Sequence, residues 1–132
     1  MTQRRLNLLV WFGILGGPAA WLSVHVIGIA FGWAQCNDPA SRWQLPVHAW
    51  DVATAAVGVL VALAAEAVSF WVFRLTADEG EGLSRRGIGE GEAPVGRLHF
   101  LSVIGLTVNP LALAIIVMVG FGTALLPLCH QA

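Results

Sequence analysis

One uninterrupted apolar run, at residues 49–73, constrains this chain most. The run is rich in alanine and valine, and Glu66 is the one charged residue well inside it; Asp51 lies at one end and Arg74 follows the other. As a helix rising about 1.5 Å per residue, it would be roughly 36 Å long, enough to cross a bilayer with some tilt. A carboxylate inside such a helix is costly, so Glu66 is a candidate functional residue.

The composition indicates that lipid surrounds most of the chain. The sequence has 132 residues, of which 57% are hydrophobic and 11% charged, whereas a soluble domain carries about 25% charged residues. Two further long apolar runs, at 6–34 and 98–128, leave room for one domain only, residues 1–132. The prediction is therefore an all-α integral membrane protein with three transmembrane helices. A net charge of −1 and the lack of a basic patch argue against nucleic acid as a partner.

The arginines predict the orientation of the three helices. Lysine is absent, and six of the seven arginines flank one side of the predicted membrane. By the positive-inside rule the N-terminus and the 75–96 loop are cytoplasmic, and the C-terminus is outside, which in a bacterium is the periplasm. The loop is polar and rich in glycine, so we expect a solvated linker. The arginines of the inner side are Arg4, Arg5, Arg74, Arg85, Arg86 and Arg97, and the one on the outer side is Arg42.

Four glycines of the first run predict a helix-packing face. Gly13 and Gly17 are spaced i, i+4, as are Gly28 and Gly32, and the two pairs fall on one face of a helix. Small residues at this spacing let helix backbones approach closely in lipid. Pro18 is expected to kink this helix, because proline lacks a backbone donor and its ring clashes with the preceding turn. Pro110 predicts a similar bend in the third helix.

Both cysteines are expected just outside the outer face of the membrane. Each follows the end of a predicted helix, and disulfides persist in that compartment, so we predict a bridge between Cys36 and Cys129. The alternative is a metal site that also uses His48 and His130, since two cysteines and two histidines suit zinc or copper. Their spacing matches no tight metal motif, and we expect no metal.

Three polar residues are predicted to lie inside the membrane as a buried polar ladder. Counted from the cytoplasmic ends of the helices, Glu66 is about 12 Å deep, Asn109 about 18 Å and His25 about 28 Å. One interpretation is part of a proton path, since glutamate and histidine exchange protons and asparagine can bridge them. The other is hydrogen bonding that holds helices together, with Glu66 uncharged, or binding to a partner helix.

Other chemistry finds little support in the sequence. The four histidines invite a b-type haem with two axial imidazoles, but their predicted depths differ, and Cys-x-x-Cys-His is absent. We expect no cofactor. Ser23, Ser69 and Ser102 are expected to bond back to their own helices. No nucleophile–base pair stands out, so we expect no catalytic residues and no enzyme activity from this chain by itself.

Two stretches resemble a group of small bacterial membrane proteins encoded beside haem–copper cytochrome oxidases. They are GPAAWLSVH at 17–25, followed after an apolar turn by Cys36, and the ending LLPLC at 125–129. Glu66 is not part of the match. The resemblance implies a non-catalytic accessory subunit of a respiratory complex in a bacterial inner (plasma) membrane.

The function expected from these observations is that of a structural accessory subunit of a multi-subunit respiratory membrane complex, a terminal cytochrome oxidase. Its partners would be the lipid bilayer and other membrane subunits, with the glycines of the first helix packed against the large subunit. One alternative is a haem- or quinone-binding membrane anchor of an oxidoreductase. Another is a small homo-oligomeric proton-coupled transporter that uses Glu66.

Overall fold

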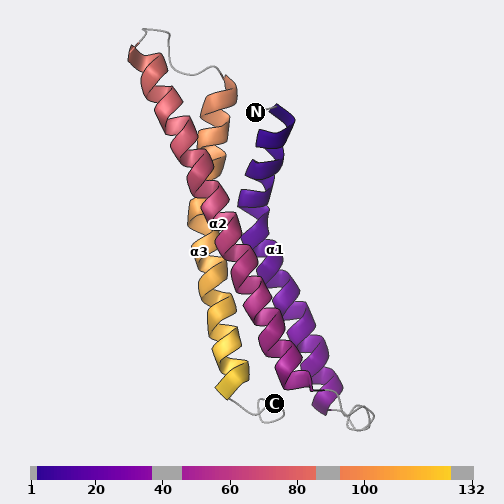
Figure 1. Cartoon of the computed structure of the whole chain (residues 1–132). Coiled ribbons are helices and arrows are strands. Elements are labelled where there is room, and N and C mark those ends of the chain that lie inside the picture. The colour runs from indigo at the N-terminus through magenta and orange to yellow at the C-terminus, as the bar shows by residue number, and fades with distance from the viewer. Residues whose placement is uncertain (1–2, 37–45, 86–92, 126–132) are drawn as a thin grey trace.

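Three long helices make up the described part of the protein. The computed structural model describes residues 3–36, 46–85 and 93–125, which form α1 (Gln3–Cys36), α2 (Val47–Arg85) and α3 (Ala93–Leu125). The helices run alternately in opposite directions, so the start of α1, the end of α2 and the start of α3 share one end of the bundle (Figure 1). Each helix contains a segment long and apolar enough to cross a membrane. The predicted all-helical fold is confirmed, with three helices that are long and apolar enough to span a membrane.

The helix ends differ from the prediction at the 75–96 loop. That range is wrong as a loop, because α2 continues to Arg85 and α3 already begins at Ala93; residues 86–92 lie outside the described residues. No proline interrupts the chain between Phe73 and Arg85, and a glycine inside a helix costs only about 1 kcal/mol. At 1.5 Å per residue α2 is about 58 Å long, far more than the roughly 30 Å hydrocarbon core. One end of α2 therefore projects beyond the other two helices (Figure 1).

Small side chains form the core. Alanines from two helices surround Ile116 of α3, and the cluster comprises Ala20, Val24, Ala55, Ala62 and Ile116. Small residues bring the helices close, which increases van der Waals contact, the main force between helices in lipid. Asn109 is among the three largest fully buried side chains, so a polar residue also occupies the centre of the bundle.

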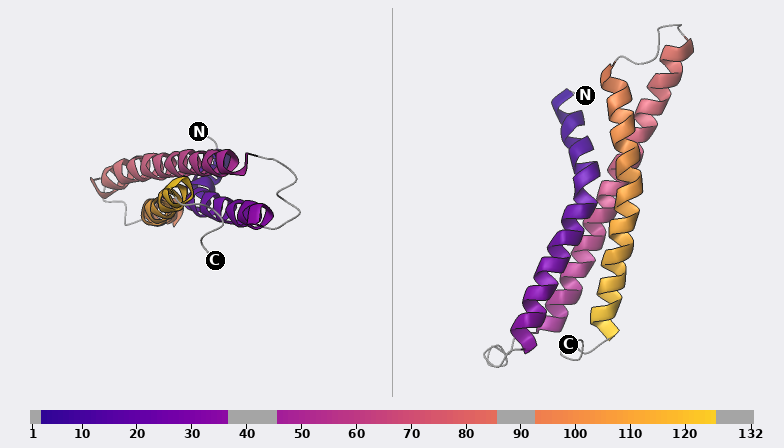
Figure 2. Two further views of the ribbon diagram at one scale, coloured as in Figure 1. Left: turned by 90° about the horizontal axis from the view of Figure 1, so that it is seen from below. Right: turned by 180° about the vertical axis from the view of Figure 1, so that it is seen from behind.

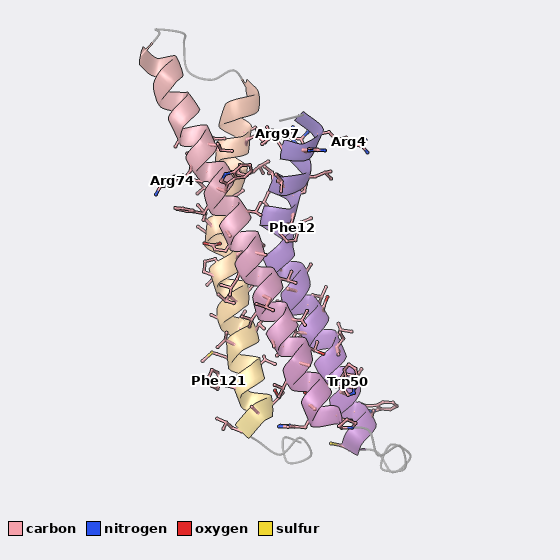
Figure 3. The ribbon with its side chains drawn as sticks, viewed as in Figure 1. Arg4, Phe12, Trp50, Arg74, Arg97 and Phe121 are labelled. Atoms are coloured by element: carbon pink, nitrogen blue, oxygen red, sulfur yellow. The ribbon has the colours of Figure 1, made fainter. Side chains whose placement is uncertain are left out.

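Large apolar side chains cover the outside of all three helices. This is the inverse of a soluble helical bundle and matches a lipid surrounding. The two ends differ in chemistry: the labelled arginines lie toward the end where α1 begins, and Trp50 and Phe121 lie toward the other (Figure 3). Exposed examples on the three helices are Leu8, Phe12, Leu15, Leu22, Leu60, Trp71, Leu111, Met118 and Phe121.

The two prolines lie inside continuous helices. α1 runs through Pro18 and α3 through Pro110 without a break. Both helices nevertheless change direction along their length, α1 more clearly, as the rear view shows (Figure 2). A proline leaves one carbonyl of the preceding turn without its helical donor, and a membrane helix tolerates this when neighbouring helices supply hydrogen bonds nearby.

Candidate functional site

The backbone carbonyl of Gly13 is the point at which the three helices are joined by hydrogen bonds. Ser69 of α2 donates its hydroxyl to this oxygen at 3.1 Å, and Asn109 of α3 donates its side-chain Nδ2 at 2.7 Å. All three residues are buried. We call Gly13, Ser69, Gly105 and Asn109 the Gly13 cluster.

Three glycines, which have no side chain, make this cluster possible. A Cβ at Gly13 would lie 2.7 Å from Oγ of Ser69, and a Cβ at Gly105 of α3 would collide with the same hydroxyl from the other side. A Cβ at Gly17 would collide with Oδ1 of Asn109. Glycine at these three positions therefore admits two polar side chains into the centre of the bundle.

Ser69 differs from the other two membrane serines. Ser23 donates to the carbonyl of Ala19, and Ser102 donates to that of His99, both within their own helices, as predicted. The prediction is wrong for Ser69, whose hydroxyl reaches across to α1. The physical reason is the close approach of α1 at Gly13, which brings the Gly13 carbonyl within hydrogen-bonding distance of the Ser69 hydroxyl.

Glu66 and Asn109 of the predicted polar ladder come together, although their depths were predicted to differ. The Asn109 amide interacts with the half-buried Glu66 carboxyl group. Oε2 of Glu66 and Oδ1 of Asn109 are shielded and have no hydrogen-bond partner among the described residues. The depth estimate counted Glu66 from Arg74 and Asn109 from Arg97, and these two arginines lie at different heights along the bundle (Figure 3).

His25 does not join this pair. It lies eight residues beyond Gly17 on α1, about 12 Å along the helix axis from the Asn109 contact. Its ring is 5.5 Å from that of Trp21, centroid to centroid, and its Nδ1 is shielded with no partner in the described part of the chain. The ladder is thus not continuous: it consists of one pair and a separate histidine.

The four predicted packing glycines fall into two groups. Gly13 and Gly17 are covered by α2 and α3 of the same chain, so a partner subunit cannot use them. Gly28 faces Asp51, whose Oδ1 would lie 3.4 Å from an added Cβ. No described residue lies within 4 Å of an added Cβ at Gly32, so the described part of α2 and α3 does not cover this position.

Asp51 is a buried carboxylate that the sequence did not single out. It is only 5% exposed, and its Oδ2 is shielded without a hydrogen-bond partner among the residues described here. His48, one turn earlier on α2 and exposed, interacts with it electrostatically. Its place at the edge of an apolar run resembled an ordinary interfacial charge. The signal that could have found it is Gly28, which leaves space opposite.

A histidine joins α2 and α3 near the end where α3 begins. Nδ1 of His99 lies 3.0 Å from the hydroxyl of Thr76, and the His99 ring stacks on Phe73 with centroids 4.8 Å apart. The Thr76 hydroxyl also donates to carbonyls of its own helix. Because threonine has a single O–H, this arrangement favours His99 as the donor to Thr76.

The cysteine prediction is only partly covered by the structure. Cys36 ends α1, is exposed and is disulfide-bonded. Cys129 and His130 lie outside the described residues, as do Arg42 and Arg86 of the orientation argument, so the Cys36–Cys129 bridge stays a prediction. Within the described ranges, no three residues among histidine, cysteine, aspartate and glutamate are grouped so that they could hold a metal ion.

Comparisons with known proteins add nothing to this geometry. No protein family, no curated protein and no solved structure matches this chain.

Proposed function

We propose that this protein is a structural accessory subunit of a multi-subunit respiratory membrane complex, a terminal cytochrome oxidase. The observation that carries the accessory role is the Gly13 cluster. Ser69 and Asn109, the polar side chains at the centre of the bundle, both donate to one backbone carbonyl. These two hydrogen bonds hold the three helices together. The oxidase as partner rests on the sequence resemblance.

The outer surface supports an assembly role. No described residue covers Gly32 of α1, and bulky apolar side chains surround the bundle. Small residues let a neighbouring helix approach closely in lipid. We propose that α1 meets the large subunit around Gly28 and Gly32, and not along all four glycines.

The inner membrane and the orientation belong to the same proposal. The exposed arginines Arg4, Arg74 and Arg97 all lie toward the end where α1 begins (Figure 3). By the positive-inside rule this end faces the cytoplasm, which places the N-terminus inside and the C-terminus in the periplasm.

A haem anchor is less well supported by the described histidines. Two axial ligands of one haem must lie at one level of the bundle. Asp51 lies opposite Gly28, so His25 and His48 fall on either side of that level, about 9 Å apart along the axis. His99 packs near the opposite end of the bundle.

The test is gentle detergent extraction of the tagged protein from its native membrane, followed by mass spectrometry and a visible spectrum. Oxidase subunits in stoichiometric amounts, with their haem bands, are the expected result. A pigment bound to this chain alone would favour the anchor. A homo-oligomer without pigment would overturn the accessory role, and transport lost on Glu66→Gln would then be the next measurement.

A matched pair of variants sharpens this test. Gly32→Leu fills the uncovered place and should reduce the oxidase subunits recovered, while Ala30→Leu, at an exposed position two residues away, should not. Equal recovery with both variants would contradict the proposed contact at Gly32.

A further inference from the structure

Among the described residues, Glu66 has no charged neighbour to balance a negative charge. The α1 segment packed at this level, residues 10–20, contains no titratable side chain, and neither does the α3 segment 100–115. On its own helix the nearest cation is Arg74, eight residues or about 12 Å away along the axis, with its guanidinium over the Phe70 ring. A carboxylate here would be a lone charge in a lipid surrounding, which is costly.

Two oxygen atoms, one of Glu66 and one of Asn109, have no hydrogen-bond donor among the described residues. The Gly13 carbonyl can only accept, so the Asn109 atom 2.7 Å from it must be the amide nitrogen. The orientation of the Asn109 amide is therefore fixed, and Oδ1 is its other end. Oδ1 and Glu66 Oε2 are both shielded, and both lack a donor among the described residues. While Glu66 is ionised, each of these oxygens can only accept.

No other donor among the described residues bonds to these two oxygens. The Ser69 hydroxyl and one N–H of Asn109 donate to Gly13. The second N–H of Asn109 cannot bond to Oδ1 of its own amide, and no bond joins it to Oε2 of Glu66. A donor from a partner subunit cannot reach either oxygen, because their own chain covers both. Buried polar atoms are nearly always hydrogen-bonded. A proton on Glu66 turns one of the two acceptors into a donor for the other.

We propose that Glu66 is a proton-binding site, held as a neutral carboxylic acid whose O–H donates a hydrogen bond to Oδ1 of Asn109. The proton then completes a series of bonds across the bundle. Glu66 of α2 donates to Asn109 of α3, and Asn109 donates to Gly13 of α1, which also accepts from Ser69. This site uses residues of this chain only, so a failure of the proposed function would leave it unaffected.

The test is infrared spectroscopy of the purified full-length protein in lipid nanodiscs at neutral pH. A protonated carboxylic acid has a carbonyl stretching band separate from the amide bands. We expect this band in the native protein, and we expect Glu66→Gln to remove it. Asp51→Asn is the control for the other buried carboxylate and should leave the Glu66 band in place. Absence of a band that depends on Glu66 would overturn the proposal.

A second comparison tests the hydrogen bond to Asn109. Glu66→Gln keeps a donor at this position, whereas Glu66→Met keeps the length of the side chain and loses the donor. We expect the unfolding equilibrium constant of Glu66→Gln to stay near that of the native protein, and that of Glu66→Met to rise about threefold or more. A methionine variant as stable as the glutamine variant would contradict the bond.

Discussion

Ser69 tests, at the scale of one residue, what the shared Gly13 carbonyl contributes to stability. Ser69→Ala removes one of its two donors, the 3.1 Å bond from α2. Side-chain hydrogen bonds between membrane helices contribute about 0.6 kcal/mol on average and at most about 1.7 kcal/mol. We expect Ser69→Ala to lower the free energy of unfolding by an amount within that range. The measurement is circular dichroism during denaturation in mixed micelles.

Ser23→Ala is the matched control for this variant. The Ser23 hydroxyl donates to Ala19 of its own helix on an exposed face, and its loss leaves the contacts between helices unchanged. Equal losses in the two serine variants would show that the bond from Ser69 to Gly13 adds nothing.

A second residue-scale prediction concerns the glycines of α1. Gly17→Ala places a Cβ against Oδ1 and the backbone of Asn109, so either α3 must move away or the bond to Gly13 must lengthen. Overpacking of this kind costs about 1–3 kcal/mol. Gly32→Ala meets nothing described within 4 Å and should be neutral or slightly stabilising. The melting temperature of Gly17→Ala should be clearly lower than that of Gly32→Ala. A melting temperature of Gly17→Ala equal to or above that of Gly32→Ala would contradict the packing.

At this scale the sequence predicted the polar residues inside the bundle, but it did not predict their hydrogen-bond partners. Glu66 and Asn109 were predicted because polar residues are rare in long apolar runs. The partner of Ser69 could not be predicted, since it depends on how far α1 is rotated about its axis. Asp51 was passed over because the end of a run does not reveal whether a neighbouring helix covers it.

At the scale of elements, the contact between α2 and α3 near the start of α3 depends on His99. His99→Ala removes the bond to Thr76 and the stacking on Phe73. An aromatic pair contributes about 0.5–1.5 kcal/mol beyond its buried area, so we expect a loss of at least that size. Hydrogen exchange should show the first turns of α3 less protected than in the native protein.

His48→Ala is the control for this element, since His48 is exposed at the other end of α2. Unchanged exchange in both histidine variants would mean that His99 does not fasten α3.

The helices themselves were largely predictable and their ends were not. Apolar runs locate the spanning segments, because lipid requires apolar side chains there. Lipid sets no such requirement beyond the membrane. There α2 continues through a charged stretch to Arg85, where neither a hydrophobic pattern nor a proline indicates where the helix stops.

At the scale of the whole molecule, the predicted Cys36–Cys129 bridge would tie the end of α1 to the segment after α3. Reduction of a disulfide that closes so long a stretch of chain typically costs about 2–4 kcal/mol. We expect a lower melting temperature in reductant and a mobility difference between reduced and non-reduced samples on a denaturing gel.

Cys129→Ser is the matched variant for this bridge. It should remove both effects and leave Cys36 reactive toward a maleimide in the absence of reductant. A thiol that reacts in the native, non-reduced protein would contradict the bridge.

The shared carbonyl of Gly13 also has a consequence for biosynthesis. Its two donors are 56 and 96 residues away along the chain, so a ribosome adding about 5–20 residues per second makes them about 2–8 s apart. During that interval α1 and α2 can pair as a hairpin through Ser69. The last helix must then find a surface that is already partly assembled. A nascent chain that stops before Asn109 would lack the second of these two hydrogen bonds.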